Sequence, residues 1–274
     1  MPLPILHGSN QPTTEMLVRY FHQTERHWTE HFAEPMELDV GVAFTNPSLP
    51  NVHDANRVLM ASLPEGISAA DALKLVEDHF AQQGVRCSSW TMNPSAPDAQ
   101  RRPLVELLVS RGYKPIALDI LYLRQVHVPA VLDASDLTII PARASFRHAR
   151  ALAEEAAKQW NEPQLADAAM LHLDDPHWDA LLALKDGVAV AEAGVLAAGE
   201  IGRIDDLFVA PANRHQGIAR IMMDRILEIC ARSLFKHVFA SCDPGNQNAQ
   251  SLYRKLGFEK IGQFVPFHAP QIAK

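Results

Sequence analysis

The feature that most constrains this chain is a short basic, glycine-containing junction between a strand and a helix. Residues 205–209 read Asp-Asp-Leu-Phe-Val, and a turn with proline separates them from the pattern Arg214-x-x-Gly217-x-Ala219. The apolar residues that follow recur every three or four positions, which predicts an amphipathic helix with one face in a core. We therefore expect a strand, a tight turn and a helix that packs back on the strand.

Such a junction is suited to bind an anion. The first backbone N–H groups of a helix have no partner within the helix and lie at the positive end of its dipole. Gly217 and Ala219 leave room for a diphosphate to approach the backbone, and Arg214 adds a positive charge. The same six residues are also compatible with an ordinary strand-to-helix turn, because short glycine motifs often occur by chance.

A second motif follows at the distance expected of a helix, a strand and another helix. It reads Asn246-x-x-Ala249-x-x-Leu-Tyr253-x-x-x-Gly257-Phe. With both motifs present in this order, residues 137–274 resemble the GNAT superfamily of N-acetyltransferases. In that superfamily the first motif binds the pyrophosphate of acetyl-CoA. The second contacts the pantetheine arm and often supplies a tyrosine acid.

The resemblance implies a role for each part of the two motifs. The strand end would pair with the pantetheine and hold the acetyl group, and the loop with the first helical turn would hold the pyrophosphate. Tyr253 would protonate the departing thiolate, although a packed aromatic side chain is the alternative interpretation. The residues expected to contact acetyl-CoA are Leu207, Phe208, Val209, Arg214, His215, Gln216, Gly217, Ile218, Ala219, Arg220, Asn246, Ala249 and Tyr253.

The reaction also needs a group that takes a proton from the attacking amine. Asp205 is the first candidate, because diamine acetyltransferases of the superfamily have Glu-Asp-Phe-Phe-Val where this chain has Asp-Asp-Leu-Phe-Val. Asp is one methylene shorter than Glu, so a water molecule would have to relay the proton. Asp243, at the end of the next predicted strand, is the second candidate. A solvated or ion-paired Asp205 is the alternative to a catalytic one.

The first half of the chain repeats the pattern of the second. One offset of 145 residues places Leu107–Ile116 on Leu252–Ile261, so that helix end, glycine, aromatic residue and next strand coincide. Chance is the competing explanation, because glycine commonly ends helices. We predict an α/β (α+β) chain with two GNAT-like domains, each a mixed, mostly antiparallel twisted sheet flanked by helices. In the first half we expect a helix at about 13–33 and strands at 38–44 and 57–61.

The two predicted domains cover residues 1–130 and 136–274, joined by a short segment rich in proline and alanine. The first domain lacks the residues that the resemblance assigns to acetyl-CoA. Residues 63–71, at the place of the anion loop, contain one glycine, no preceding Arg and a Glu that would repel phosphate. Leu108 aligns with Tyr253. We therefore predict a degenerate copy without a CoA loop, which shapes the acceptor pocket or orients the second domain.

Charge and composition limit the partners. With 25 basic and 32 acidic residues the net charge is −7, so nucleic acid is not an expected partner and a cationic amine is mildly favoured as acceptor. No apolar run approaches the ~18 residues of a membrane span, and the N-terminus lacks the pattern of a signal peptide. Three widely spaced cysteines fit a reducing compartment. A cytoplasmic protein that does not bind membranes is the expectation.

A rival motif is His27-x-x-Glu30-His31, which matches the pattern of inverted zinc peptidases. Those enzymes are much larger, and histidines are spread along this chain, so no metal is predicted. The predicted function is an acetyl-CoA-dependent N-acetyltransferase that acetylates a primary amine by direct attack, with acetyl-CoA as co-substrate. The alternative is a non-catalytic CoA-binding sensor or scaffold. The acceptor, a small molecule or a peptide amine, and the oligomeric state, including a homodimer, are left open.

Overall fold

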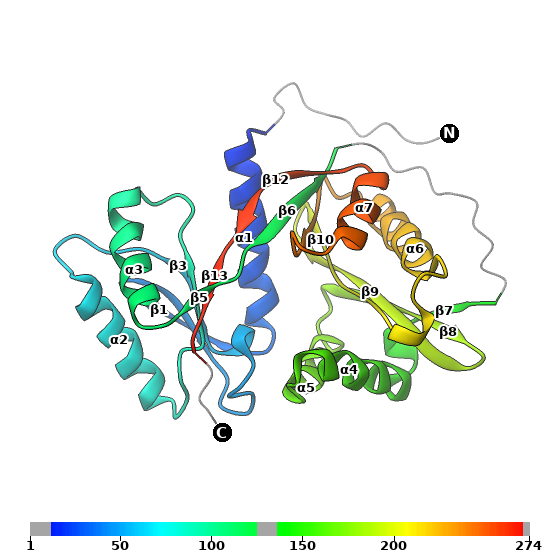
Figure 1. The fold of residues 1–274 in the computed structure, drawn as a ribbon, viewed down its shortest axis with the longest axis horizontal. Helices are drawn as coiled ribbons and strands as arrows, with labels where there is room; N and C mark the ends of the chain where they lie inside the picture. The colour runs from blue at the N-terminus through cyan, green and yellow to red at the C-terminus, as the bar shows by residue number, and fades with distance from the viewer. Residues whose placement is uncertain (1–11, 125–135, 271–274) are drawn as a thin grey trace. The chain divides into compact units, whose positions relative to one another are not determined.

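The computed structural model describes residues 12–124 and 136–270 of the chain (Figure 1). Contacts along the chain divide it into two compact units. Unit 1 comprises Met1–Thr24, Asp119–Leu152 and Pro176–Gln263, and unit 2 comprises Glu25–Leu118, Ala153–Asp175 and Phe264–Lys274. The helices α1 (Thr14–Glu30) and α4 (Phe146–Trp160) contribute residues to both units, and α5 (Gln164–His172) belongs to unit 2.

Unit 1 is built on a seven-stranded mixed sheet. Its elements are β6 (Leu118–Leu123), β7 (Thr138–Pro141), β8 (Trp178–Lys185), β9 (Val188–Ala198), β10 (Ile201–Val209), α6 (Ile218–Arg232), β11 (His237–Cys242), α7 (Gln247–Lys255) and β12 (Phe258–Phe264). The strand order is β12-β6-β11-β10-β9-β8-β7. The strands β7 to β10 are antiparallel neighbours, β10 and β11 are parallel, and β6 is antiparallel to β11.

The core of unit 1 lies between this sheet and α6. The apolar stripe of α6 is buried, as its three- and four-residue spacing predicts, and Met222 and Ile226 have no exposed surface. Ala191, Ala193 and Val195 of β9 belong to the same core. Because side chains alternate across a strand, the residues of β9 between these three point to the opposite face of the sheet.

Unit 2 is built on a six-stranded sheet. Its elements are β1 (Glu34–Leu38), β2 (Gly41–Thr45), β3 (Arg57–Ala61), α2 (Ala69–Gln82), β4 (Ser89–Met92), α3 (Asp98–Ser110), β5 (Lys114–Pro115) and β13 (Pro266–His268). The order is β1-β2-β3-β4-β13-β5, with β3 and β4 parallel and the other neighbours antiparallel. Leu73, Val76 and Phe80 of α2, together with Leu104 and Leu108 of α3, pack on this sheet.

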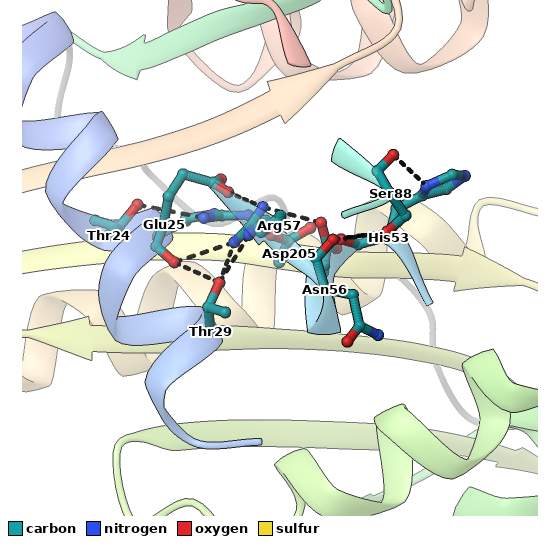
Figure 2. A network of polar contacts seen from close by, with 10 residues as sticks. Thr24, Glu25, Thr29, His53, Asn56, Arg57, Ser88 and Asp205 are labelled. Carbon is teal, nitrogen blue, oxygen red and sulfur yellow. Dashed lines mark hydrogen bonds and ion pairs between the residues drawn. The ribbon is translucent and has the colours of Figure 1, made fainter. Parts of the chain in front are cut away.

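A buried cation also stabilises unit 2. Arg57 is 1% exposed, and its guanidinium donates to Glu25 at 2.8 Å, to Asp54 at 2.9 Å and to the hydroxyl of Thr29. Figure 2 shows the contacts of Arg57 with Glu25 and Thr29. A buried charge is tolerated only where opposite charges and hydrogen bonds compensate the loss of its hydration. The buried position of Arg57 therefore depends on the carboxylates of Glu25 and Asp54.

The two sheets exchange one strand each. β6, from the first half of the sequence, lies between β11 and β12, whereas β13, from the end of the chain, lies between β4 and β5. In Figure 1 the red strand β13 accordingly lies beside green β5, and green β6 beside red β12. The prediction of two mixed, mostly antiparallel sheets flanked by helices is confirmed. The predicted domain boundary, between residues 130 and 136, falls outside the described residues.

Short 3₁₀ turns complete the architecture: η1 (His53–Ala55), η2 (Ala142–Ala144) and η3 (Pro211–Asn213). None of the helices in the described ranges combines the length and the apolar character needed to cross a lipid bilayer.

Candidate functional site

The sheet of unit 1 opens at the end of β10. Parallel pairing between β10 and β11 covers only Ile201–Ile204 against His237–Ala240, although β10 continues to Val209. On its other edge β10 stays paired with β9 as far as Val209. The backbone edge of residues 205–209 that faces β11 is therefore left outside the ladder. Such an edge can pair with an extended ligand that enters between the two strands.

A bulge in β10 marks the same place. The register against β9 shifts between Asp205 and Phe208, and Asp206 has a left-handed φ of 54°. A non-glycine residue in this conformation costs on the order of 1–3 kcal/mol and persists only where the surrounding structure holds it. Bulges redirect side chains and increase the local twist of a strand. The bulge thus coincides with the point at which β10 and β11 part.

The loop after β10 opens α6 with an uncapped N-terminus. His215 and Gly217 have φ values of 62° and 81°, and no side chain caps the helix at Gly217. Left-handed residues among right-handed ones turn several N–H groups toward one side, a geometry that binds anions. A Cβ placed on Gly217 would meet no atom within 4 Å. The predicted anion loop is therefore both open and furnished with N–H donors.

Basic side chains surround this loop. The Nε of Arg214 donates to the carbonyl of Val209 at 2.9 Å, and Arg220 is paired with Asp224 at 3.0 Å. Lys185, at the end of β8, donates to the side chain of Gln216 at 3.0 Å. No sequence pattern marks Lys185, because only the fold brings the hairpin that follows β8 to the loop.

Tyr253 lies in α7 and is 5% exposed. Its ring packs edge-on against Phe258, with the ring centroids 5.4 Å apart, and it lines a cavity of about 470 Å³ together with Gln250 and Asp119. Burial raises the pKa of the Tyr253 hydroxyl, and the negative charge of Asp205 raises it further. The hydroxyl is therefore protonated at neutral pH, as a proton donor must be.

The carboxylate of Asp205 is held on both sides. One oxygen accepts from the guanidinium of Arg203, and the other accepts from the N–H of Asp206 at 3.1 Å. Arg203 is buried over the ring of Phe21, with 5.2 Å between its guanidinium carbon and the ring centroid, and contacts Thr24. The ion-paired arrangement, one of the two sequence interpretations of Asp205, is thus present.

Asp243 and Asn246 organise the start of α7. The Oδ1 of Asp243 accepts from the N–H of Gly245 at 2.7 Å, in the turn that follows β11. The Oδ1 of Asn246 accepts from the N–H of Ala249 at 3.1 Å, so Asn246 is the N-cap of α7. Both polar side chains therefore serve the local fold, and the cap explains the spacing of Asn246 and Ala249 in the second motif.

One further acidic residue faces this region. Glu192 is the single charged residue of β9 and stands opposite Phe208 of β10. A charged residue in an otherwise apolar strand was the signal available in the sequence. The position of Glu192 opposite Phe208 was not predicted, because apolar alternation in the sequence does not specify which strand pairs with β9.

The described residues contain no group of three or more His, Cys, Asp or Glu that could hold a metal ion. His27 lies on the exposed face of α1 beside Glu30, whereas His31 follows the helix and its Nε2 contacts the carbonyl of Leu171 at 2.9 Å. The two histidines of the zinc-peptidase pattern are thus engaged in different local contacts.

Known proteins resemble this chain in sequence pattern and in fold. The model of the acetyltransferase (GNAT) family matches residues 146–258. A GCN5-related N-acetyltransferase from Kribbella flavida is similar in structure, with a TM-score of 0.65 and 17% identity over 92% of this chain and 95% of that one. A conserved protein of unknown function from Staphylococcus epidermidis gives 0.62 and 14%, over 88% and 95%.

A tandem GNAT protein from the clavulanic acid biosynthesis pathway gives a TM-score of 0.51 and 16% identity, over 73% of this chain and 70% of that one. No curated protein sequence matches the chain. Because the identities are this low, the structural likeness shows the fold alone. It covers both halves of the chain. Residues 146–258 thus match the model of the GNAT acetyltransferase family, and the solved structures show that the fold of both halves is GNAT-like.

Proposed function

We propose that this protein is an N-acetyltransferase that transfers the acetyl group of acetyl-CoA to a primary amine of a small molecule by direct attack. The observation that carries the proposal is that two features lie together at the end of β10. One is the strand edge that lies outside the β10–β11 ladder, and the other is the uncapped N-terminus of α6. Pantetheine is an extended chain with amide groups, and a pyrophosphate is an anion. Each therefore has a complementary surface here.

The acetyl-CoA contacts follow from this arrangement. The backbone of Leu207, Phe208 and Val209 pairs with the pantetheine, and the pyrophosphate lies over the start of α6, where Arg214 exchanges its bond to Val209 for a phosphate oxygen. The N-cap of α7 borders the pantetheine. The other proposed contact residues are His215, Gln216, Gly217, Ile218, Ala219, Arg220, Asn246, Ala249 and Tyr253.

The residues at the site divide the chemistry among them. A backbone N–H at the end of β10 stabilises the oxyanion that forms when the amine attacks the thioester carbonyl. Tyr253 gives its proton to the departing thiolate. Asp205 and Asp243 are the two candidates from the sequence for the group that takes the proton of the amine, and Asp205 is near enough for its charge to act on Tyr253. The acidic side chains near the bulge favour a cationic amine over a neutral one.

The alternative function is a CoA-binding sensor or scaffold without turnover. Its support is that Asp205 is ion-paired and Asp243 and Asn246 serve the local fold. The two functions share the acetyl-CoA site, so binding tests both and turnover separates them.

The test of the site is a calorimetric titration with acetyl-CoA of the wild type, Gly217→Glu and Gly199→Glu. Gly199 is the matched control, because it also has a positive φ of 61° and open space, but lies in the β9–β10 turn. We expect micromolar binding near one site per chain, weakened at least ~30-fold by Gly217→Glu through charge repulsion and loss of the turn geometry. Gly199→Glu should leave it unchanged. Absence of binding by the wild type would overturn the proposal.

A further inference from the structure

One carboxylate of β9, that of Glu192, lies on the face of the sheet that is turned away from α6. Ala191 and Ala193 of β9 are buried against the α6 side, so Glu192 between them points to the other face. In the register with β10, Glu192 stands opposite Phe208 and Gly194 stands opposite Asp205. Opposite residues of an antiparallel pair share a face and have Cα atoms about 4.5–5.5 Å apart. Glu192 and Asp205 therefore flank the bulge from neighbouring strands.

The surroundings of Glu192 are mainly apolar. On β8 the residue opposite Glu192 is Leu182, which is fully buried. The indole of Trp178 covers Gly194, since a Cβ at Gly194 would lie 2.2 Å from that ring. The charged groups nearby belong to β10, namely Asp206 in the bulge and the Asp205–Arg203 pair. Burial, with a smaller contribution from the charge of Asp206, raises the pKa of the Glu192 carboxyl to about 8.

Glu192 and Asp205 differ in their hydrogen-bond and ion-pair partners. Both oxygens of Asp205 already accept hydrogen bonds, one of them from a buried guanidinium. Within the described residues no cation contributes to the electrostatics of Glu192, and this residue keeps part of its surface exposed. A general base is most effective when its pKa lies near the pH at which the enzyme works.

We propose that Glu192 is the proton acceptor for the attacking amine, and that Asp205 is a positioning residue that fixes Arg203 and the bulge. This inference rests on the proposed function. As the amine nitrogen bonds to the acetyl carbon and the carbon–sulfur bond breaks, one proton passes from nitrogen to Glu192 and one from Tyr253 to sulfur. Exchange with water then removes the proton from Glu192 and restores that of Tyr253.

The experiment measures acetyl transfer from acetyl-CoA to a panel of simple primary amines, from ethylamine to spermidine, by the wild type, Glu192→Gln and Glu200→Gln. Glu200 is the control because it lies in the turn between β9 and β10, where it pairs with Lys236. We expect Glu192→Gln to lower kcat/KM by about 10²- to 10⁴-fold, the usual contribution of a general base, with unchanged acetyl-CoA affinity. It should also abolish the acidic limb of the pH–rate profile. Glu192→Asp should restore part of the rate.

A second readout does not depend on turnover. Because the folded state holds the proton of Glu192 more tightly than the unfolded state, ionisation penalises folding, and stability falls between the ordinary titration range of glutamate and about pH 8. Glu192→Gln should remove this fall. The Tm difference between variant and wild type should therefore grow toward pH 8 and vanish in acid.

The outcomes separate the two proposals. A wild type that binds acetyl-CoA but acetylates no amine overturns both the proposed function and the role of Glu192. An active wild type whose Glu192→Gln variant keeps its rate and its acidic limb overturns only the role of Glu192.

Discussion

The two units share a scaffold and differ at the start of one helix. In each unit a helix joins two parallel strands, α6 between β10 and β11 and α2 between β3 and β4. α6 begins at left-handed Gly217 without a side-chain cap. α2 begins after Ser68, whose hydroxyl accepts from the N–H of Asp71 at 3.1 Å and donates to its carboxylate at 2.6 Å. The capped and acidic start of α2 disfavours a phosphate, whereas the start of α6 keeps its first N–H groups without a side-chain cap.

The bulge, by contrast, is present in both units. Met60 in β3 and Asp206 in β10 have φ values of 58° and 54°, and each lies three residues after a buried arginine, Arg57 or Arg203. Both strands shift register at this point, β3 against β4 and β10 against β9. The bulge and its cation therefore belong to the scaffold. What distinguishes unit 1 is the set of acidic side chains around the bulge and the open loop beyond it.

The largest expected effect concerns the arginine of unit 2. Arg57→Ala should lower the free energy of unfolding by about 3–5 kcal/mol, because it removes one partner of a buried ion pair with Glu25. Urea unfolding measures the change. The control is Arg26→Ala, which breaks exposed pairs with Glu30 and Glu37 and should cost less than about 1 kcal/mol. Equal losses in the two variants would mean that the buried cation is not part of the scaffold.

A second effect tests the difference between the two halves at Tyr253. The offset of 145 residues aligns Leu108 of α3 with Tyr253 of α7, and a leucine cannot donate a proton. Tyr253→Phe should reduce kcat by about 10²- to 10⁴-fold with little change in acetyl-CoA affinity, since only the hydroxyl is lost. Tyr122→Phe is the control. Burial also raises the pKa of Tyr122, which lies in β6 and whose hydroxyl is hydrogen-bonded to Nδ1 of His237. An unchanged kcat in Tyr253→Phe would make Tyr253 a packing residue alone.

The smallest effect tests the helix cap of unit 2. Ser68→Ala should cost ~1 kcal/mol of stability, the usual value for loss of an N-cap. Ser95→Ala, in an exposed turn, should change stability by less than about 0.5 kcal/mol.

We also expect no second acetyl-CoA site in calorimetry, because the loop before α2 lacks a counterpart of Arg214. Two bound molecules per chain would contradict the assignment of unit 2 as a copy without CoA binding.

The local features of unit 1 could be predicted from the sequence. The periodicity of α6, the positive φ of Gly217 and the cap at Asn246 are each set by a few neighbouring residues. The glycine offset between the halves also holds, because Gly112 and Gly257 both end a helix with positive φ. These features depend on backbone conformation and spacing, which the sequence encodes locally.

Features that depend on distant partners were not predictable. The segment 38–44, expected as one strand, is the end of β1, a turn at Asp39 and Val40, and most of β2. The pairing of Asp205 with Arg203 and the place of Glu192 opposite Phe208 depend on strand register. Apolar alternation identifies a strand but does not specify its neighbour, so the exchange of β6 and β13 was also missed.

The strand exchange has a consequence for the order in which the protein is made. A ribosome synthesises every other strand of the unit 2 sheet well before residues 266–268, yet β4 and β5 are joined only through β13. Until the last residues emerge, β4 has an exposed edge, which is the part of a sheet most prone to wrong pairing. The first-made sheet is therefore completed last. A stop codon shortly before residue 266 would damage the half of the protein that is encoded farthest from it.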